Sequence, residues 1–329
     1  MKLSIITTLY KSEPYLRKCL DSLLDQDLTP DDYELVIVND GSPDGCADIV
    51  REYQRTHSNI VLVQQENRGL PEARNTGLRH VTGNYVTFVD PDDYVQPQVY
   101  GRLLHKVMDE DLDMLRFGYT MIEEGTGRVL PKYKESLLTV DYSDSITDGE
   151  TFLGRRLGFA CYVWQFLFRT SLFRDHDILF REKVFDDADL LPRLIPFVHR
   201  VTSVDTPVYF YTQRPDSLAN AQNRPGALKK IEGFFYVIEQ YNGYYTQYHS
   251  SYARKWLRSS ITSAWVAIMQ TAAVYDYANR QQYIDRFHSC NVLPLSCYRR
   301  ARKKRTHIFL LRILGPNIYS RLYRRISKK

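Results

Sequence analysis

The first hundred residues alternate between short apolar runs and segments in which apolar residues recur every three or four positions. Leu3–Leu9 and Tyr33–Val38 are nearly continuous apolar runs rich in β-branched residues, which is typical of strands buried on both faces. Apolar side chains at helical spacing occupy residues 13–24 between them. The same alternation continues with helices expected at 46–57 and 70–81 and strands at 60–63 and 85–89. This order predicts an α/β fold with a mostly parallel sheet, right-handed crossovers and helices on both faces.

The pattern changes after about residue 113. The sequence predicts further strands at 114–122 and 207–212, helices at 148–158 and 187–198, and a helical region over 226–290. We therefore expect an α/β body over residues 1–220, with a break in its pattern near 112, followed by a helical region over 221–298 and a tail over 299–329. The Pro- and Gly-containing segment at 220–226 is the expected boundary between body and helical region.

The composition is that of a globular protein. Of the 329 residues, 43% are apolar and 25% are charged, which excludes disorder, a collagen-like repeat and a disulfide miniprotein. No apolar stretch reaches about 18 residues, and the N-terminal segment runs into charge early, so we expect neither a membrane span nor a cleaved signal. The five cysteines form no CxxC pair, which favours reduced thiols and a cytoplasmic location.

The charge is distributed unevenly along the chain. The net charge is +5, but residues 299–329 contain 12 Lys and Arg and no Asp or Glu, so the preceding body is acidic. A basic cluster at 299–305 precedes an apolar run at 308–314 and an amphipathic segment at 318–326. This pattern predicts peripheral attachment to an anionic membrane surface. A solvated terminal helix packed on the body is the alternative, and nucleic-acid binding is not expected because the positive charge is confined to the tail.

Polar residues follow three of the predicted strands. Tyr10, Asp40 and Asp90–Asp93 stand at strand ends, where open parallel sheets place their ligand crevice. Asp90 and Asp92 form an Asp-x-Asp turn whose carboxylates suit Mg²⁺ or Mn²⁺ together with diphosphate oxygens, although acidic turns after strands are common. Arg68 and Arg74 would suit a phosphate near the same edge, or belong to a solvated helix. The sequence contains no GxGxxG, GxxxxGK[ST], HExxH or GxSxG motif, which disfavours conventional dehydrogenases and hydrolases.

Four segments in order, with their spacing, carry a family resemblance. They are residues 4–24 (SIITTLYKSEPYLRKCLDSLL), 34–45 (ELVIVNDGSPDG), 66–78 (ENRGLPEARNTGL) and 83–95 (GNYVTFVDPDDYV). Together they resemble the N-terminal half of inverting family 2 glycosyltransferases, which have the GT-A fold. The resemblance continues through residues 162–169 (YVWQFLFR), 185–189 (FDDAD) and 209–217 (YFYTQRPDS), and it covers about residues 1–220. It implies a nucleotide-binding half over 1–112 and an acceptor half over 113–220.

The resemblance also implies roles in donor binding. Thr8 and Tyr10 would line the nucleotide pocket, with the tyrosine ring against the base, and Asp40 would accept a hydrogen bond from the base. Arg68 and Arg74 would lie near the donor diphosphate or sugar. The sequence reads Thr-Leu-Tyr-Lys at 8–11 where the family commonly has Pro-Val-Tyr-Asn, so the contacts of this first loop are expected to differ.

The remaining implied roles concern metal, base and acceptor. Asp90 would contact the ribose or a Mn²⁺ or Mg²⁺ ion, and Asp92 would ligate that ion. Asp187 matches the second carboxylate of the family's Glu-Asp pair and would be the general base, with Asp189 as the alternative. Trp164 would be an aromatic platform on the acceptor side.

These expectations combine into one hypothesis. The chain would be a metal-dependent inverting glycosyltransferase that moves a sugar from a nucleotide-sugar donor, expected to be a UDP-sugar. The acceptor would be a glycan or a lipid-linked hydroxyl in surface polysaccharide synthesis at the inner face of the cell membrane. The alternatives are a nucleotidyltransferase, which would release pyrophosphate, and a non-catalytic membrane-associated protein that binds nucleotides or glycans.

Overall fold

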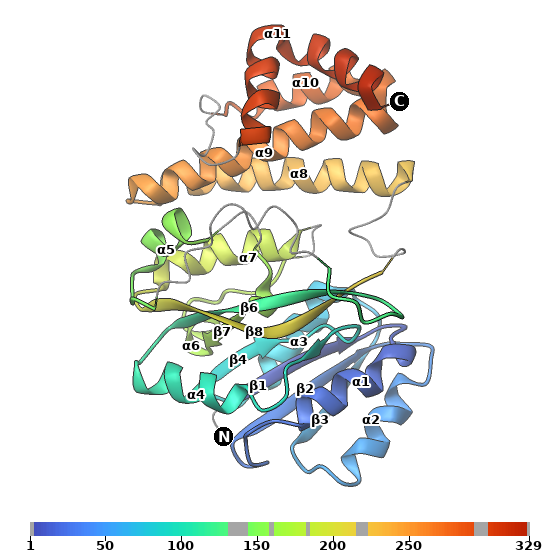
Figure 1. The fold of residues 1–329 in the computed structure, drawn as a ribbon, viewed down its shortest axis with the longest axis vertical. Coiled ribbons are helices and arrows are strands. Elements are labelled where there is room, and N and C mark those ends of the chain that lie inside the picture. Colours follow the sequence, from blue (N-terminus) through green and yellow to red (C-terminus); the bar gives the residue numbers. More distant parts are fainter. Residues whose placement is uncertain are drawn as a thin grey trace.

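An eight-stranded sheet forms the centre of the body (Figure 1), in the order β3-β2-β1-β4-β7-β6-β8-β5. The computed structural model describes residues 3–130, 144–157, 161–181, 185–214, 223–292 and 302–327. The strands are β1 Leu3–Leu9, β2 Tyr33–Asp40, β3 Ile60–Gln65, β4 Tyr85–Phe88, β5 Tyr94–Val95, β6 Met114–Glu123, β7 Phe166–Arg169 and β8 Val201–Gln213.

The first four main strands are parallel, as the sequence predicts. β1 lies between β2 and β4, and Leu9 is opposite Asn39 while Ile6 is opposite Phe88. The carboxyl ends of these strands therefore meet at one edge of the sheet. β2 extends two residues beyond its predicted end, because Asp40 still pairs with β3 opposite Gln65. Asp40 is thus the last residue of a strand and not the first residue of a loop.

Beyond β4 the sheet becomes mixed. β7 pairs antiparallel with both β4 and β6, whereas β6 and β8 are parallel to each other. The sequence pattern does not predict β7 as a strand. It is only four residues long and follows directly on a 3₁₀ helix at Val163–Gln165, so it has too few positions to show a period.

Helices cover both faces of the sheet and create two hydrophobic cores. In the body they are α1 Glu13–Leu24, α2 Cys46–Gln54, α3 Leu70–His80, α4 Tyr100–Asp109, α5 Gly149–Arg155, α6 Ser171–Arg174 and α7 Asp186–Leu194. One core joins α1, α2 and α4 to the sheet, and the other joins α3, α5, α6 and α7 to its opposite face. Leu16 and Leu20 of α1 are fully buried, and each such side chain stabilises the fold by about 1.5–3 kcal/mol.

Four further helices follow the body and lie beyond α7 in Figure 1. They are α8 Arg224–Tyr244, α9 Ser251–Tyr275, α10 Arg280–Ser289 and α11 Arg302–Ser327. α8 and α9 share the core of the α3 face, which runs without interruption from Ile6 of β1 to Trp256 of α9. Buried tyrosines of α8 also reach α7, because the Tyr241 hydroxyl donates to the Ala188 carbonyl oxygen at 2.8 Å. The helical region is therefore packed onto the body.

α11 consists of two helical halves joined at a kink. Gly315 has φ +71°, a left-handed conformation that favours glycine, and Pro316 follows it. Over the part of the chain with described coordinates, none of the helices combines the length and apolar character needed to cross a membrane.

Candidate active site

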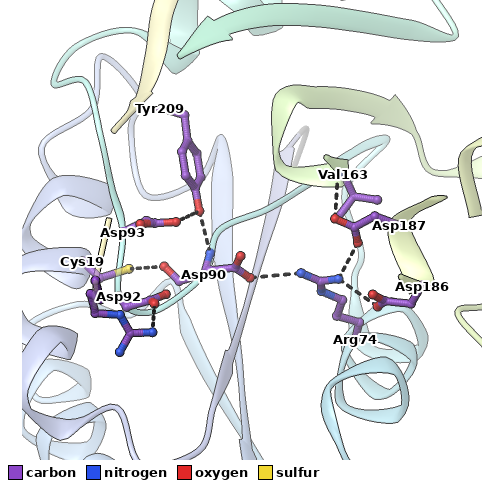
Figure 2. Close-up of polar contacts among 10 residues, drawn as sticks. Cys19, Arg74, Asp90, Asp92, Asp93, Val163, Asp186, Asp187 and Tyr209 are labelled. Atoms are coloured by element: carbon purple, nitrogen blue, oxygen red, sulfur yellow. Dashed lines mark hydrogen bonds and ion pairs between the residues drawn. The ribbon is translucent and has the colours of Figure 1, made fainter. Parts of the chain in front are cut away.

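Arg74 of α3 is the centre of a cluster of carboxylates at the carboxyl edge of the parallel strands (Figure 2). Its guanidinium donates to Asp90 at 3.1 Å, to Asp186 at 3.0 Å and to Asp187 at 2.7 Å. Asp90 follows β4, and the other two aspartates begin α7. The predicted residues Arg74, Asp90 and Asp187 are therefore brought together from three separate segments.

Close packing of α3 on the sheet places Arg74 in this position. A Cβ added to Gly77, one turn further along α3, would be 2.6 Å from Ile6 Cγ2, so the helix can approach β1 this closely only with glycine there. The next residue after Arg74, Asn75, holds the chain before α7: its side chain accepts from Phe180 N at 2.7 Å and donates to Phe180 O at 2.9 Å. These contacts fix α3 relative to both the sheet and the segment that leads to α7.

One guanidinium in this cluster faces three carboxylates. The Arg74 side chain is only 4% exposed, and Asp187 also accepts from Val163 N at 3.4 Å. Loss of hydration raises the pKa of Asp187 to about 7; Arg74 opposes this shift, while Asp186 and Asp90 add to it by repulsion. Loss of hydration and repulsion by Asp90 also raise the pKa of Asp186, against the effect of Arg74. A carboxylate with a pKa near neutrality can both accept and release a proton under physiological conditions.

Asp189, the alternative base, points elsewhere. It is buried, and its carboxylate accepts from the Tyr244 hydroxyl at 2.8 Å and from Arg193 Nε at 2.9 Å. Tyr244 belongs to α8, so Asp189 joins α7 to the C-terminal helices. This geometry favours Asp187 over Asp189 as the group that faces the sheet edge.

The Asp-x-Asp turn is held by a tyrosine from β8. Tyr209 donates its hydroxyl to Asp93 at 2.7 Å and accepts from the backbone N–H of Asp90 at 3.1 Å. Burial and the neighbouring carboxylates raise the pKa of Asp93 well above its usual value. Asp92 forms an ion pair with Arg214 from the end of β8. Burial and repulsion by Asp90 raise the pKa of Asp92, against the effect of Arg214.

The donor set of this turn fits a hard divalent cation in part. Asp90 and Asp92 supply carboxylate oxygens. The two negative charges repel each other, and a bound cation would offset this repulsion. Among the described residues, no three His, Cys, Asp or Glu side chains are arranged to enclose a metal. The two carboxylates therefore suit an open site in which diphosphate oxygens complete the coordination, and guanidinium groups of Arg74 and Arg214 face them in this structure.

The residues predicted to bind the nucleotide lie at the same edge of the sheet but differ in burial and in hydrogen bonding. Thr8 is buried at the end of β1, and Tyr10 just beyond it is 47% exposed. Asp40 is buried, and its two carboxylate oxygens accept from Gln65 and from the backbone N–H groups of Arg68 and Gly69 at 2.7–2.9 Å. The carboxylate therefore anchors the loop before α3. The Arg68 side chain is exposed.

Trp164 is part of a stack of aromatic rings. Its ring is stacked against Tyr209 at 4.2 Å and against Tyr162 at 4.7 Å, and the side chain is only 3% exposed. An acceptor platform requires an accessible face, and neighbouring rings cover Trp164. In this structure Trp164 supports Tyr209, and the partly buried Tyr162 is the more accessible ring of the two.

The sequence pattern indicates no individual role for Tyr209, Arg214 or Asp93. Tyr209 of β8 and Arg214, which directly follows β8, belong to the 209–217 segment of the resemblance, and the sequence predicts this strand only over 207–212. Alternation along the strand places Tyr209 and Tyr211 on one face, and both contact Trp164. This two-residue alternation is the feature of the sequence that could have indicated a shared role for Tyr209 and Tyr211. No local pattern indicates that Arg214 reaches Asp92, because the pairing of β8 with β5 and β6 decides it.

Comparison with known proteins gives a consistent result. The sequence model described as Glycosyl transferase family 2 matches residues 4–176. The chain is 31% identical over 247 residues to "Uncharacterized glycosyltransferase EpsJ" of Bacillus subtilis, covering 73% of this chain and 70% of that protein. It is 29% identical over 244 residues to "Poly(ribitol-phosphate) beta-N-acetylglucosaminyltransferase TarS" of Staphylococcus aureus, covering 72% of this chain but only 39% of TarS.

Solved structures with the same fold include two glycosyltransferases. The structure of S. aureus TarS 1–349 in complex with UDP-GlcNAc has a TM-score of 0.59 at 20% identity and covers 88% of this chain and 90% of that one. The mannosyltransferase PcManGT from Pyrobaculum calidifontis, in complex with GDP-Man and Mn²⁺, has a TM-score of 0.57 at 18% identity and covers 100% and 88%. The predicted GT-A type α/β fold with a helical C-terminal region is thereby confirmed.

Proposed function

The chain belongs to glycosyl transferase family 2, and from this premise we propose that it is a metal-dependent inverting enzyme. It would transfer a sugar from a UDP-sugar to a hydroxyl of a glycan or lipid-linked acceptor in the synthesis of a surface polysaccharide. The single observation that carries the proposal is the meeting of the Asp-x-Asp turn with the acidic start of α7 through Arg74. This junction supports a diphosphate site next to a carboxylate that would accept a proton.

Asp187 is the proposed general base. As the acceptor oxygen attacks the anomeric carbon, a new C–O bond forms and the bond from that carbon to the diphosphate oxygen breaks. The hydroxyl proton passes to a carboxylate oxygen of Asp187, and the nucleoside diphosphate leaves with the bonding electron pair. Attack from the side opposite the leaving group inverts the anomeric centre. The pKa of about 7 lets Asp187 accept this proton at neutral pH.

Arg74 and the Asp-x-Asp turn would hold the donor. Asp92 and Asp90 would ligate Mn²⁺ or Mg²⁺, which when bound neutralises charge on the leaving diphosphate. Arg74 is fixed by its carboxylates beside this position and would contribute positive charge without having to reorganise. Thr8 and Tyr10 would contact the nucleoside, and Asp40 would act by shaping the loop that carries Arg68.

The relatives support the proposed donor and acceptor. The TarS structure is described with UDP-GlcNAc, and TarS is named for poly(ribitol-phosphate) as its acceptor. PcManGT is described with GDP-Man and Mn²⁺, which supports a divalent cation but a different nucleotide. A UDP-sugar and a repetitive surface polymer are therefore the proposed substrates. The nucleotide-binding half would be residues 1–112 and the acceptor half 113–220. The helical region over 221–298 would follow, with α8 in contact with α7 and α9 in contact with α5 of the acceptor half, and then the basic tail over 299–329.

A screen of nucleotide sugars with and without Mn²⁺ tests this proposal. A UDP-sugar should raise the melting temperature, because a ligand that binds the folded state alone stabilises it. The increase should occur only when Mn²⁺ is present, because the proposed ion held by Asp90 and Asp92 binds the diphosphate. The product of turnover should be UDP. Release of pyrophosphate would instead identify a nucleotidyltransferase, and binding without any turnover would identify the non-catalytic alternative. Stabilisation by UDP-sugars that is independent of the metal would refute the role of Asp90 and Asp92.

A further inference from the structure

An exposed apolar stripe runs along the C-terminal helix α11. Among the described residues, five large apolar side chains are more than half exposed, and four of them belong to this helix. They are Phe309 at 61%, Ile313 at 62%, Ile318 at 51% and Ile326 at 71% exposure. Such a concentration on one helix is unusual on a free protein surface and indicates an interaction site.

The stripe has helical order in both halves of α11. Phe309 and Ile313 are four residues apart before the kink, and Ile318, Leu322 and Ile326 recur every four residues after it, so each set lies on one helical face. A different face of each half is buried, and α11 packs on α9 and α10. Ile308 and Leu311 are buried in the first half, and Tyr319 and Ser320 are buried in the second.

The inner face of α11 is fixed by specific contacts. The Tyr319 hydroxyl accepts from Gln270 Nε2 of α9 at 3.1 Å, and Asn317 donates to Gln281 Oε1 of α10 at 2.9 Å. Arg324 lies 4.4 Å from the ring centroid of Tyr277. These contacts fix the half of α11 after the kink, so Ile318, Leu322 and Ile326 face away from α9 and α10.

Positive charge accompanies the stripe. Arg321 and Arg325 are exposed, and on a helix they lie directly beside Ile318 and Leu322. The segment 299–329 contains 12 Lys and Arg and no acidic residue. A partner for this surface must accept apolar side chains and carry negative charge over a wide area. An anionic lipid bilayer has both properties, and its headgroups attract Lys and Arg while its acyl boundary accepts apolar side chains.

We propose that the outward face of α11, formed by Phe309, Ile313, Ile318, Leu322 and Ile326, docks on the surface of an anionic bilayer. This inference rests on the proposed function, because it supplies the membrane at which that acceptor would be found. With α11 on the bilayer, α9 and α8 lie between the membrane and the sheet in Figure 1. Each helix layer is about 8–10 Å thick. The acceptor hydroxyl must therefore stand at the end of an extended glycan or polymer.

Vesicle co-sedimentation of the full chain tests the docking face. The wild-type protein should sediment with phosphatidylcholine vesicles that contain phosphatidylglycerol, and added salt should weaken this binding. The triple variant Ile318→Ser, Leu322→Ser and Ile326→Ser should bind at least tenfold more weakly. The matched control is Val61→Ser, Met108→Ser and Val129→Ser, which alters three exposed apolar residues elsewhere and should bind like the wild type.

Two further measurements keep the result unambiguous. The pair Arg321→Gln and Arg325→Gln should lose binding to anionic vesicles without a change in melting temperature, because both side chains are exposed. Hydrolysis of the UDP-sugar without acceptor should proceed at the same rate in the wild type and in all variants. Absence of this hydrolysis in the wild type would contradict the proposed function and would leave the test of the docking face unaffected. Undiminished vesicle binding by the triple variant would overturn the proposal. So would a wild-type oligomer that the triple variant dissociates without any vesicle binding, since the stripe would then join copies of this chain.

Discussion

Asp187→Asn should make the protein both inactive and more stable above neutral pH. The substitution keeps the shape of the side chain and removes its charge. The carboxyl pKa rises from 3.8 to about 7 in the folded protein, and each tenfold change in proton affinity corresponds to 1.36 kcal/mol. The fold therefore disfavours the ionised form by about 4 kcal/mol. Since 21% of the side chain is still exposed, solvent screening reduces this to about 2–4 kcal/mol.

The sign of the effect depends on pH. A carboxyl group with a raised folded-state pKa binds its proton more tightly in the folded protein, so its contribution to stability declines as pH rises from about 4 to about 7. The amide of the Asp187→Asn variant does not ionise, so the variant does not lose stability in this way as the pH rises. Arg74 still pairs with Asp90 and Asp186 in the variant, so no uncompensated buried cation is created. At pH 8 the variant should melt about 3–6 °C above the wild type, and the two should converge near pH 4.

The assay combines thermal melting with sugar transfer from the proposed UDP-sugar donor. Transfer should fall by roughly 10²–10⁴, which is the usual contribution of a general base, while donor affinity is retained. Asp186→Asn is the matched control, because Asp186 contacts the same guanidinium nitrogen at 3.0 Å and its pKa is also raised. It should stabilise the protein with a far smaller loss of transfer. Wild-type transfer by Asp187→Asn would refute its role as base, and a lower melting temperature at pH 8 would refute the electrostatic reasoning.

Three other perturbations probe the same site. The kcat/KM of the wild type should rise about tenfold per pH unit below a pKa near 7 and then level off as Asp187 ionises; a flat profile from pH 5 to 8 would argue against this base. Asp92→Asn should weaken Mn²⁺-dependent binding of UDP by about tenfold or more in calorimetry, and unchanged Mn²⁺-dependent binding would contradict its role as a ligand. Tyr209→Phe leaves the Asp90 N–H and Asp93 without their shared hydroxyl, so it should lower the free energy of unfolding by about 1–3 kcal/mol and raise the KM for the donor. Chemical denaturation at pH 7 measures the stability change, and an unaltered midpoint would contradict the positioning role of the tyrosine.

Local pattern was enough to predict the parallel half of the sheet. The strands at 3–9 and 85–89 are apolar on both faces, and only a sheet covered on both sides can bury such residues. Because parallel strands end at one edge, the approximate position of the site followed from the same argument. The same argument predicts that the Asp-x-Asp turn lies at this edge.

The second half of the sheet required tertiary information. β7 has only four residues, and its place between β4 and β6 is set by pairing with strands that are distant in sequence. The contacts of Arg214 with Asp92 and of Tyr209 with Asp93 follow from the same pairing. Sequence spacing carries no information about such partners. Likewise, it could not separate Asp187 from Asp189, which are two positions apart on α7 but face different parts of the molecule.

The sequence alone therefore determined which residue types were available and in what order, since periodicity and turn residues depend on neighbours along the chain. It also determined the charge of the tail. Only the tertiary structure decided that one buried guanidinium holds three carboxylates from two segments, and that Trp164 is covered by other rings. Hydration and electrostatic repulsion depend on distances in space, so the pKa of Asp187 became accessible only when α3, the β4 turn and α7 were brought together.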